Sequence, residues 1–159
     1  HLREGHTVEG DSLPDKTEFM LGSGVDSSWG KNVPELEMVE MEEMTKIGTG
    51  YFLTTPVFDL DSFEKFLKNV NTFGVPVIAE VLIIRNASMG QFLNRHVKPG
   101  MVPDWVIKKL LRAPEKKKAS IEIFADLATG LKDLCQGIHI ISIGGEEHLR
   151  HYLDAADLY

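Results

Sequence analysis

Segments typical of buried strands alternate along this chain with segments typical of amphipathic helices. The clearest strand is residues 75–84, which is almost wholly apolar and β-branched and carries Pro76 only near its start. So apolar a run predicts a strand buried on both faces, as in a parallel sheet. Further strands are predicted at residues 19–25, 51–53 and 138–143, and helices at residues 34–47, 61–73, 89–96, 103–111, 119–135 and 146–156.

The order of these segments is a strand followed by helical structure, four times over, with no hairpin signal between strands. Such alternation predicts an α/β fold with a parallel sheet and right-handed crossovers. Four units make a (βα)4 half of a TIM-type (β/α)8 barrel, whose edge strands and one sheet face would be left uncovered. Three arrangements remain open: the other half lies elsewhere, two copies associate, or the sheet flattens into a small doubly wound domain. We expect residues 1–18 to form a polar tail or loop remnant and residues 19–159 to form the half-barrel domain.

The composition is that of an ordinary water-soluble domain and excludes several classes of function. The 159 residues carry a net charge of -7, which disfavours a surface for nucleic acid or anionic membranes. No apolar run is long enough to span a bilayer, and the single cysteine, Cys135, fits a reducing, cytoplasmic compartment. Because the sequence begins at His1 rather than methionine, we expect a processed or excised piece of something longer.

Three of the predicted helices carry local sequence signals. Asp61 is predicted to cap the helix after the second strand, with Glu64 completing a capping box. In the preceding helix, methionines recur at threes from Met38, a pattern more typical of core packing than of a binding surface. The basic run at residues 116–118 is interpreted as a solvated helix start.

Small polar residues follow the predicted strands, where parallel α/β proteins place their binding groups. Thr54 and Thr55 end the second strand and could hydrogen-bond a substrate, although threonine also simply suits a strand end. Asn86 follows the third strand, with an Asx turn as its structural alternative. Gly144, with the glycine after it, precedes the last helix and could receive a phosphate on backbone amides, or only form a tight turn. Asp59 fits a helix cap better than a ligand contact.

Other ionisable residues allow more than one interpretation. Glu80 lies within an apolar strand, so it should either pair with a cation such as Arg85 or have a raised pKa. Such carboxylates occur at functional sites and in structural ion pairs alike. His148 and His151 lie three apart on a helix but lack an evident third ligand, so no metal site is predicted. Cys135 is expected to be inert and to face the core.

Four motifs in register resemble the carboxyl-terminal half of the methylenetetrahydrofolate reductase family. Residues 50–59, with the order Phe-Leu-Thr-Thr-Pro-Val-Phe-Asp at their end, are similar to the family's F-x-T-Q-x-x-F-D stretch in strand six. The other three motifs are residues 75–86, which retain the strand-seven asparagine, the Pro103–Trp105 helix start, and residues 137–148, which resemble the last strand and helix. The resemblance covers residues 19–158 and implies an eight-stranded α/β barrel.

The resemblance implies reduction of methylenetetrahydrofolate to methyltetrahydrofolate, commonly with FAD passing the hydride and NAD(P)H as a possible donor. It places Thr54, Thr55 and Asn86 at the folate and Gly144 at the nucleotide. Glu80 is a further candidate for the substrate site because it is a carboxylate within an apolar strand. The family's folate-contacting glutamine falls on Thr55, and a lysine near the flavin phosphates falls on Met44.

In strand seven, a family glycine and proline are replaced by Glu80 and Ile83. The family's catalytic glutamate lies in the barrel's first half, so we assign no catalytic residue and expect hydride transfer only with that half present. Its expected partners are therefore a folate and the amino-terminal half or a second copy. The alternatives are a non-catalytic barrel fragment serving in assembly and a flavodoxin-like domain that binds a phosphorylated ligand.

Overall fold

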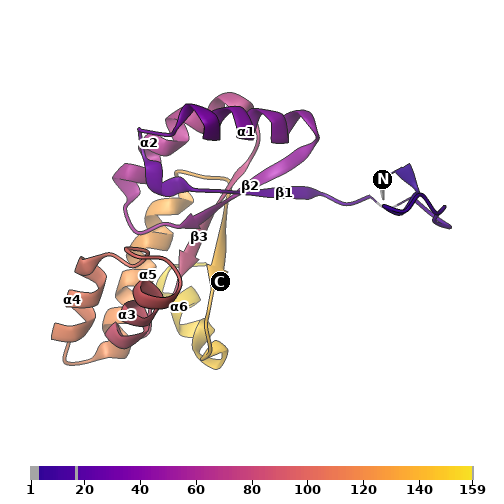
Figure 1. Cartoon of the computed structure of the whole chain (residues 1–159). Helices are drawn as coiled ribbons and strands as arrows, with labels where there is room; N and C mark the ends of the chain where they lie inside the picture. The colour runs from indigo at the N-terminus through magenta and orange to yellow at the C-terminus, as the bar shows by residue number, and fades with distance from the viewer. Residues whose placement is uncertain (1–3, 17, 159) are drawn as a thin grey trace.

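A computed structural model of the chain describes residues 4–16 and 18–158 and has a mixed α/β architecture (Figure 1). Its strands are β1 (Leu21–Val25), β2 (Thr49–Pro56), β3 (Val77–Leu82) and β4 (Gly137–Ile141). Its α-helices are α1 (Glu35–Lys46), α2 (Leu60–Val70), α3 (Ala87–His96), α4 (Asp104–Arg112), α5 (Lys116–Lys132) and α6 (Leu149–Ala155). Short 3-10 helices lie at η2 (Ser27–Trp29), η3 (Asn71–Phe73) and η4 (Glu146–His148).

The four strands form one sheet in which every neighbouring pair is parallel. The strand order in space is the order in sequence, β1-β2-β3-β4. The predicted parallel sheet is therefore confirmed, and all four strands end at the same edge. The register between β2 and β3 shifts between Leu53 and Pro56, which leaves a bulge at the carboxyl end of β2.

The two faces of the sheet differ in how far they are covered. In β3, the side chains of Val77, Ala79 and Val81 are fully buried, whereas the alternate residues Ile78 and Glu80 are only partly buried. Because successive side chains in a strand point to opposite faces, the alternation identifies a face packed against helices and a more open face. We call the second one the open face; register pairing extends it to Leu53 on β2 and to residues 137, 139 and 141 on β4.

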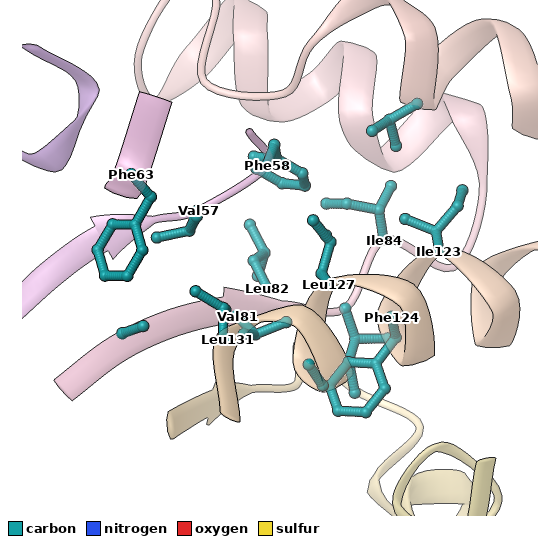
Figure 2. Close-up of a cluster of buried hydrophobic side chains, with 14 of the residues drawn as sticks. Val57, Phe58, Phe63, Val81, Leu82, Ile84, Ile123, Phe124, Leu127 and Leu131 are labelled. Atoms are coloured by element: carbon teal, nitrogen blue, oxygen red, sulfur yellow. The ribbon is translucent and has the colours of Figure 1, made fainter. Parts of the chain in front are cut away.

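The core lies between the covered face of the sheet and helices α2 and α5. Figure 2 shows Val81 of β3 in the cluster of buried side chains that includes Phe124, Leu127 and Leu131 of α5. Helix α2 contributes Phe63 and Phe66, which stack with ring centroids 6.2 Å apart and are almost completely buried. This packing aligns the strands, and so it fixes the edge at which their loops emerge.

Several predicted boundaries and caps need correction. Asp59, not Asp61, caps α2: its carboxylate accepts a hydrogen bond from the Ser62 amide at 2.9 Å, so the capping box predicted from Asp61 and Glu64 is wrong. The backbone is extended at Asp59 and helical from Leu60 onward, so the cap lies two residues before the predicted one. The structure confirms the cap interpretation of Asp59.

The helix predicted at residues 119–135 begins earlier and ends earlier. Helix α5 starts at Lys116, which confirms that the basic run is a helix start, and ends at Lys132. Cys135 therefore lies in the turn after the helix, half-buried, and its thiol contacts the carbonyls of Leu131 and Gly137. Of the methionine stripe, Met41 is buried in the core, while Ile47, predicted to continue the stripe, is exposed beyond the helix end.

The segment before the sheet is separate from the core. Residues 4–16 form a small loop held by a bridge between His6 and Ser12, and Figure 1 shows it extending away from the sheet. Residues 1–3, 17 and 159, which belong to the predicted tail and domain end, lie outside the described residues. No helix within the described ranges is long and apolar enough to cross a membrane.

Candidate functional site

Polar side chains gather at the edge where the four strands end, which we call the rim. Residue 26 follows β1, residues 54–56 end β2, residues 85–86 follow β3 and residues 142–145 follow β4. Their common placement follows from the parallel arrangement, since the carboxyl ends of all four strands share one edge. The rim therefore brings together Thr54, Thr55, Asn86 and Gly144, as the sequence predicted for a common edge.

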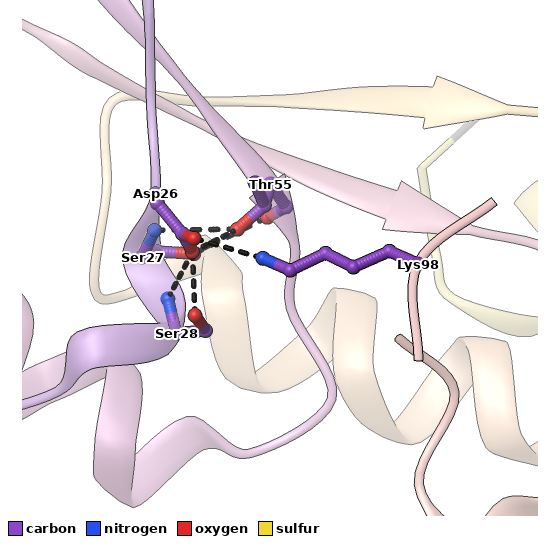
Figure 3. A network of polar contacts seen from close by, with 5 residues as sticks. All are labelled: Asp26, Ser27, Ser28, Thr55 and Lys98. Atoms are coloured by element: carbon purple, nitrogen blue, oxygen red, sulfur yellow. Dashed lines mark hydrogen bonds and ion pairs between the residues drawn. The ribbon is translucent and has the colours of Figure 1, made fainter. Parts of the chain in front are cut away.

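The most extensive hydrogen-bond network at the rim is centred on Asp26 (Figure 3). One carboxylate oxygen, Oδ1, accepts hydrogen bonds from the Ser28 amide at 2.9 Å, the Ser28 hydroxyl at 2.6 Å and the Thr55 hydroxyl at 3.2 Å. The other oxygen, Oδ2, accepts from Lys98 Nζ at 2.8 Å. Lys98 comes from the connection between α3 and α4, so the network ties a distant segment to the first two strands.

These donors determine the ionisation of Asp26. Partial burial by itself raises the pKa of a carboxyl group, because it disfavours the charged form. The hydrogen bonds from Lys98 and Ser28, together with the Lys98 charge, outweigh that effect and hold the pKa of Asp26 at about 2. Asp26 is therefore a fully ionised carboxylate at neutral pH.

Thr55 and Thr54 use their hydroxyls within the sheet. Thr55 Oγ1 accepts from the Ser27 amide at 3.2 Å, and the Ser27 hydroxyl lies 3.2 Å from the Thr55 carbonyl. Thr54 is buried; its hydroxyl donates to the Thr55 carbonyl at 2.9 Å and accepts from the Glu80 amide at 3.1 Å. The bulge at the end of β2 thus has its backbone groups satisfied by threonine side chains. Their role in binding a substrate stays a prediction.

Asn86 forms the amino-terminal cap of α3. Its side-chain oxygen accepts a hydrogen bond from the Met89 amide at 2.9 Å. The structural alternative for Asn86 was an Asx turn. The observed cap is closely related to it, because in both the side-chain oxygen accepts a hydrogen bond from a nearby backbone amide. Asn86 is an exposed residue at the rim, and its contact with a substrate stays a prediction.

Glu80 does not pair with Arg85, which was the cation suggested by the sequence. Its carboxylate oxygen Oε2 lies 3.5 Å from Nδ1 of His139 on the neighbouring strand β4. Burial raises the pKa of Glu80, and contact with His139 only partly opposes that effect. The expected raised pKa is therefore confirmed in direction, with a different partner.

Arg85 lies instead against the turn that follows β4. Its guanidinium donates to the Ile143 carbonyl at 2.9 Å, and Gly144 and Gly145 both have positive φ, +68° and +76°. A Cβ at Gly145 would lie 2.8 Å from an Arg85 nitrogen, so glycine allows the arginine to approach the backbone. This places a cation beside Gly144, a combination that suits an anionic ligand.

A pocket of about 230 Å³ lies beside the Asp26 network. Its lining combines hydroxyl and carboxylate residues, apolar residues after β2 and residues of the α3–α4 connection: Ser27, Ser28, Asp59, Ser62, Pro56, Val57, Phe58, Phe63, Gly100, Met101 and Pro103. Ser27 and Ser28 therefore border both the network and the pocket.

The two histidines of the last helical segment and the single cysteine do not form a metal site with the described residues at the rim. His148 and His151 stack edge to face with centroids 5.9 Å apart, and His148 pairs with Glu147. Across residues 4–16 and 18–158, no group of three histidine, cysteine, aspartate or glutamate residues is arranged to hold a metal ion. Burial raises the pKa of the Cys135 thiol, which lowers its reactivity.

Sequence reasoning missed three residues, namely Asp26, Lys98 and His139. Asp26 directly follows a predicted strand, so the argument applied to Asn86 would have found it. Lys98 had no local signal, because its partner lies 72 positions away in the chain. His139 would have been found only by aligning the parallel strands, which sets it opposite Glu80.

The sheet and its rim define a parallel α/β protein with polar groups gathered at the carboxyl ends of the strands. The sequence model of one family, Methylenetetrahydrofolate reductase, matches residues 26–157. The chain therefore belongs to the methylenetetrahydrofolate reductase family, and a TIM-type barrel is the fold that this membership implies.

One solved structure is similar over most of the chain. It is described as an uncharacterized protein from Clostridium thermocellum that binds two copies of 5-methyl-5,6,7,8-tetrahydrofolic acid. The match has a TM-score of 0.61 and 18% sequence identity, and it covers 87% of this chain and 53% of the other. The chain thus spans about half the length of that protein. A comparison with curated protein sequences finds no match.

Proposed function

We propose that this chain is the carboxyl-terminal half of a folate-binding barrel and that its rim and open face contribute to a reduced-folate site. The observation that carries the proposal is a four-stranded parallel sheet with one open face and polar groups at a single edge. Family membership and the folate-binding structural relative support the choice of ligand. Thr54, Thr55, Glu80 and Asn86 are the proposed folate-site residues.

Hydride transfer would require the complementary, amino-terminal half of the barrel. In that assembly, methylenetetrahydrofolate is the proposed substrate, with FAD passing the hydride and NAD(P)H as donor. Gly144, which lies beside the Arg85 guanidinium, fits an anionic group such as a flavin phosphate. This chain's own contribution is to bind and orient ligands, in a cytoplasmic setting that suits its single free thiol.

Binding measurements test this proposal directly. Calorimetric titration of 5-methyltetrahydrofolate should detect binding to the chain alone or to the chain co-expressed with a complementary half. The co-expressed complex should also carry flavin absorbance after purification. If a correctly folded complex binds neither folate nor flavin, the proposal is wrong.

A non-catalytic assembly role is the second candidate, and the uncovered sheet supports it. Strands β1 and β4 are the edges of the sheet, and unpaired strand edges favour association with further polypeptide. Light scattering on the isolated chain should then give the mass of a dimer, or of a complex when the complementary half is added. A stable monomer that does not bind the complementary half would exclude this role.

A further inference from the structure

Glu80 and His139 form a polar pair in the middle of the open face, apart from the Asp26 network. They are register partners on β3 and β4, so their side chains leave the sheet on the same side. Their contact of 3.5 Å is therefore set by the strand pairing itself and not by a flexible loop. Such a placement on rigid strands is suited to holding a ligand in one orientation.

The surroundings of Glu80 are apolar, although the residue is charged. Its register neighbours on the open face are Pro56 on β2 and, one step earlier along the strands, Leu53 opposite Ile78. The Glu80 side chain is only 13% exposed, whereas the His139 side chain is 49% exposed. The carboxylate is thus largely buried, next to apolar residues of β2 and to a half-exposed imidazole on β4.

The carboxylate still has unused hydrogen-bonding capacity. An ionised carboxylate accepts up to about four hydrogen bonds, two on each oxygen. Oε2 is in contact with His139, and within the described part of the chain no hydrogen bond reaches Oε1. A carboxylate is matched best by two parallel N–H donors in one plane.

We propose that Glu80, oriented by His139, recognises a planar heterocycle through a 2-amino-4-oxopyrimidine edge, in which a ring N–H lies next to the exocyclic amino group and the two present adjacent, coplanar N–H donors. The flat ring would lie against the aliphatic side chains of Leu53 and Ile78, while its polar edge pairs with the carboxylate. This inference rests on the proposed folate function and specifies which end of the ligand faces the sheet. The pterin ring carries that edge, whereas the benzoyl-glutamate tail is anionic and would be repelled by Glu80.

His139 acts through Glu80 and is therefore a positioning residue. Its hydrogen bond and charge both lower the pKa of Glu80 and so favour the ionised form. His139 is also the titratable residue that the neighbouring strands place next to Glu80. On the other side, β2 contributes Pro56 and Leu53, and neither of them is titratable. Ligand binding should then weaken as the pH falls through the pKa of Glu80.

The test compares E80Q with E147Q, a matched control, because Glu147 also pairs with a histidine but lies exposed on η4. Calorimetry would use 5-methyltetrahydrofolate, the ring-only probe 6-methyltetrahydropterin and the tail-only probe p-aminobenzoylglutamate. The preparation is whichever binds 5-methyltetrahydrofolate, the chain alone or its complex with a complementary half. We expect E80Q to weaken both ring-containing probes about 10- to 100-fold, since an amide cannot accept two parallel bonds from the ring.

The tail-only probe should be unaffected by E80Q, and E147Q should match the unsubstituted chain with every probe. Equal affinity of E80Q and the unsubstituted chain for the ring probes would overturn this inference while leaving the proposed function standing. No folate binding by the unsubstituted chain in either preparation would overturn both. Thermal unfolding monitored by circular dichroism tests whether E80Q is folded. If E80Q is unfolded, E80D replaces it. E80D keeps the negative charge on a shorter side chain, farther from the ligand, and the same loss of affinity for the ring-containing probes is expected.

The pH profile separates positioning from a merely structural role for His139. With H139A, the pKa of Glu80 should rise, because the opposing influence of His139 is removed while burial remains. The loss of ring-probe affinity at acid pH should then begin at a higher pH than in the unsubstituted chain. An unchanged profile in H139A would exclude the positioning role.

Discussion

Asp26 and Glu80 are both partly buried carboxylates near the carboxyl end of the sheet, yet their pKa values move in opposite directions. Asp26 accepts hydrogen bonds from Ser28 and Thr55 and pairs with Lys98, and its pKa falls to about 2. Glu80 has one imidazole contact, and burial raises its pKa. The number of donors, rather than burial, decides the direction.

This difference separates a framework group from a group available to a ligand. The acceptor sites of Asp26 are occupied by the protein, and the result is a tie between β1, β2 and the α3–α4 connection. Glu80 keeps an oxygen without a donor among the described residues, on the more open face of the sheet. Asp26 should therefore matter chiefly for stability and Glu80 chiefly for binding.

The largest expected effect on stability is that of D26A. The substitution removes the cap of η2, the Lys98 pair and the Thr55 contact together. After allowance for solvent screening, we expect the free energy of unfolding to fall by about 1–2 kcal/mol. Urea denaturation measures this as a lower midpoint at unchanged slope.

The matched control for D26A is D104A. Asp104 also pairs with a lysine, Lys108, but its side chain is 84% exposed, so the loss should be about 0.5 kcal/mol or less. If both variants lose the same amount, the Asp26 network does not hold the rim together.

Acid should abolish the contribution of Asp26. A folded-state pKa of about 2, below the ordinary value of 3.8, gives stability that is present above pH 3.8 and lost as the pH falls toward 2. The midpoints of the unsubstituted chain and D26A should therefore converge between these values. If the two urea midpoints instead differ by the same amount down to pH 2, the protonated Asp26 side chain stabilises the fold as well as the ionised one does.

The sequence could predict much of the fold because apolar periodicity reports directly on burial. The strand at residues 75–84 and the alternation of strands with helices were sufficient for the parallel sheet. The helix caps were less predictable: Asp59 and Asp61 are both reasonable caps, and only the backbone conformation at Asp59 decides between them.

The site was predictable only where the chain order determines position. Thr55 and Asn86 follow strands, so the parallel order places them at one edge. The Asp26–Lys98 pair and the Glu80–His139 pair depend on packing between distant segments and on strand register. Neither the packing nor the register can be predicted from the local sequence. For this reason Arg85 was predicted as the partner of Glu80, and the prediction was wrong.

Glu80 should show the opposite sign from Asp26. Its folded-state pKa is raised, so the folded chain loses stability as the pH rises from the ordinary value of 4.5 through the raised one. Removing the charge with E80Q should thus stabilise the chain at pH 7, with no difference below pH 4.5. Urea midpoints at pH 4 and pH 7 measure both parts; a destabilised E80Q at pH 7 would contradict the assignment.

The smallest effect is expected for K98A, and it tests the cause of the low pKa of Asp26. Lys98 is half exposed, so its loss should lower the free energy of unfolding by only about 0.2–0.5 kcal/mol. The pKa of Asp26, followed by carboxyl carbon chemical shifts, should nevertheless rise above 2, because a hydrogen bond and a positive charge are both removed. It should stay below the value that burial alone would give, since the Ser28 amide and hydroxyl still donate to the carboxylate. An unchanged pKa in K98A would assign the whole shift to Ser28 and leave the α3–α4 connection without an electrostatic role at the rim.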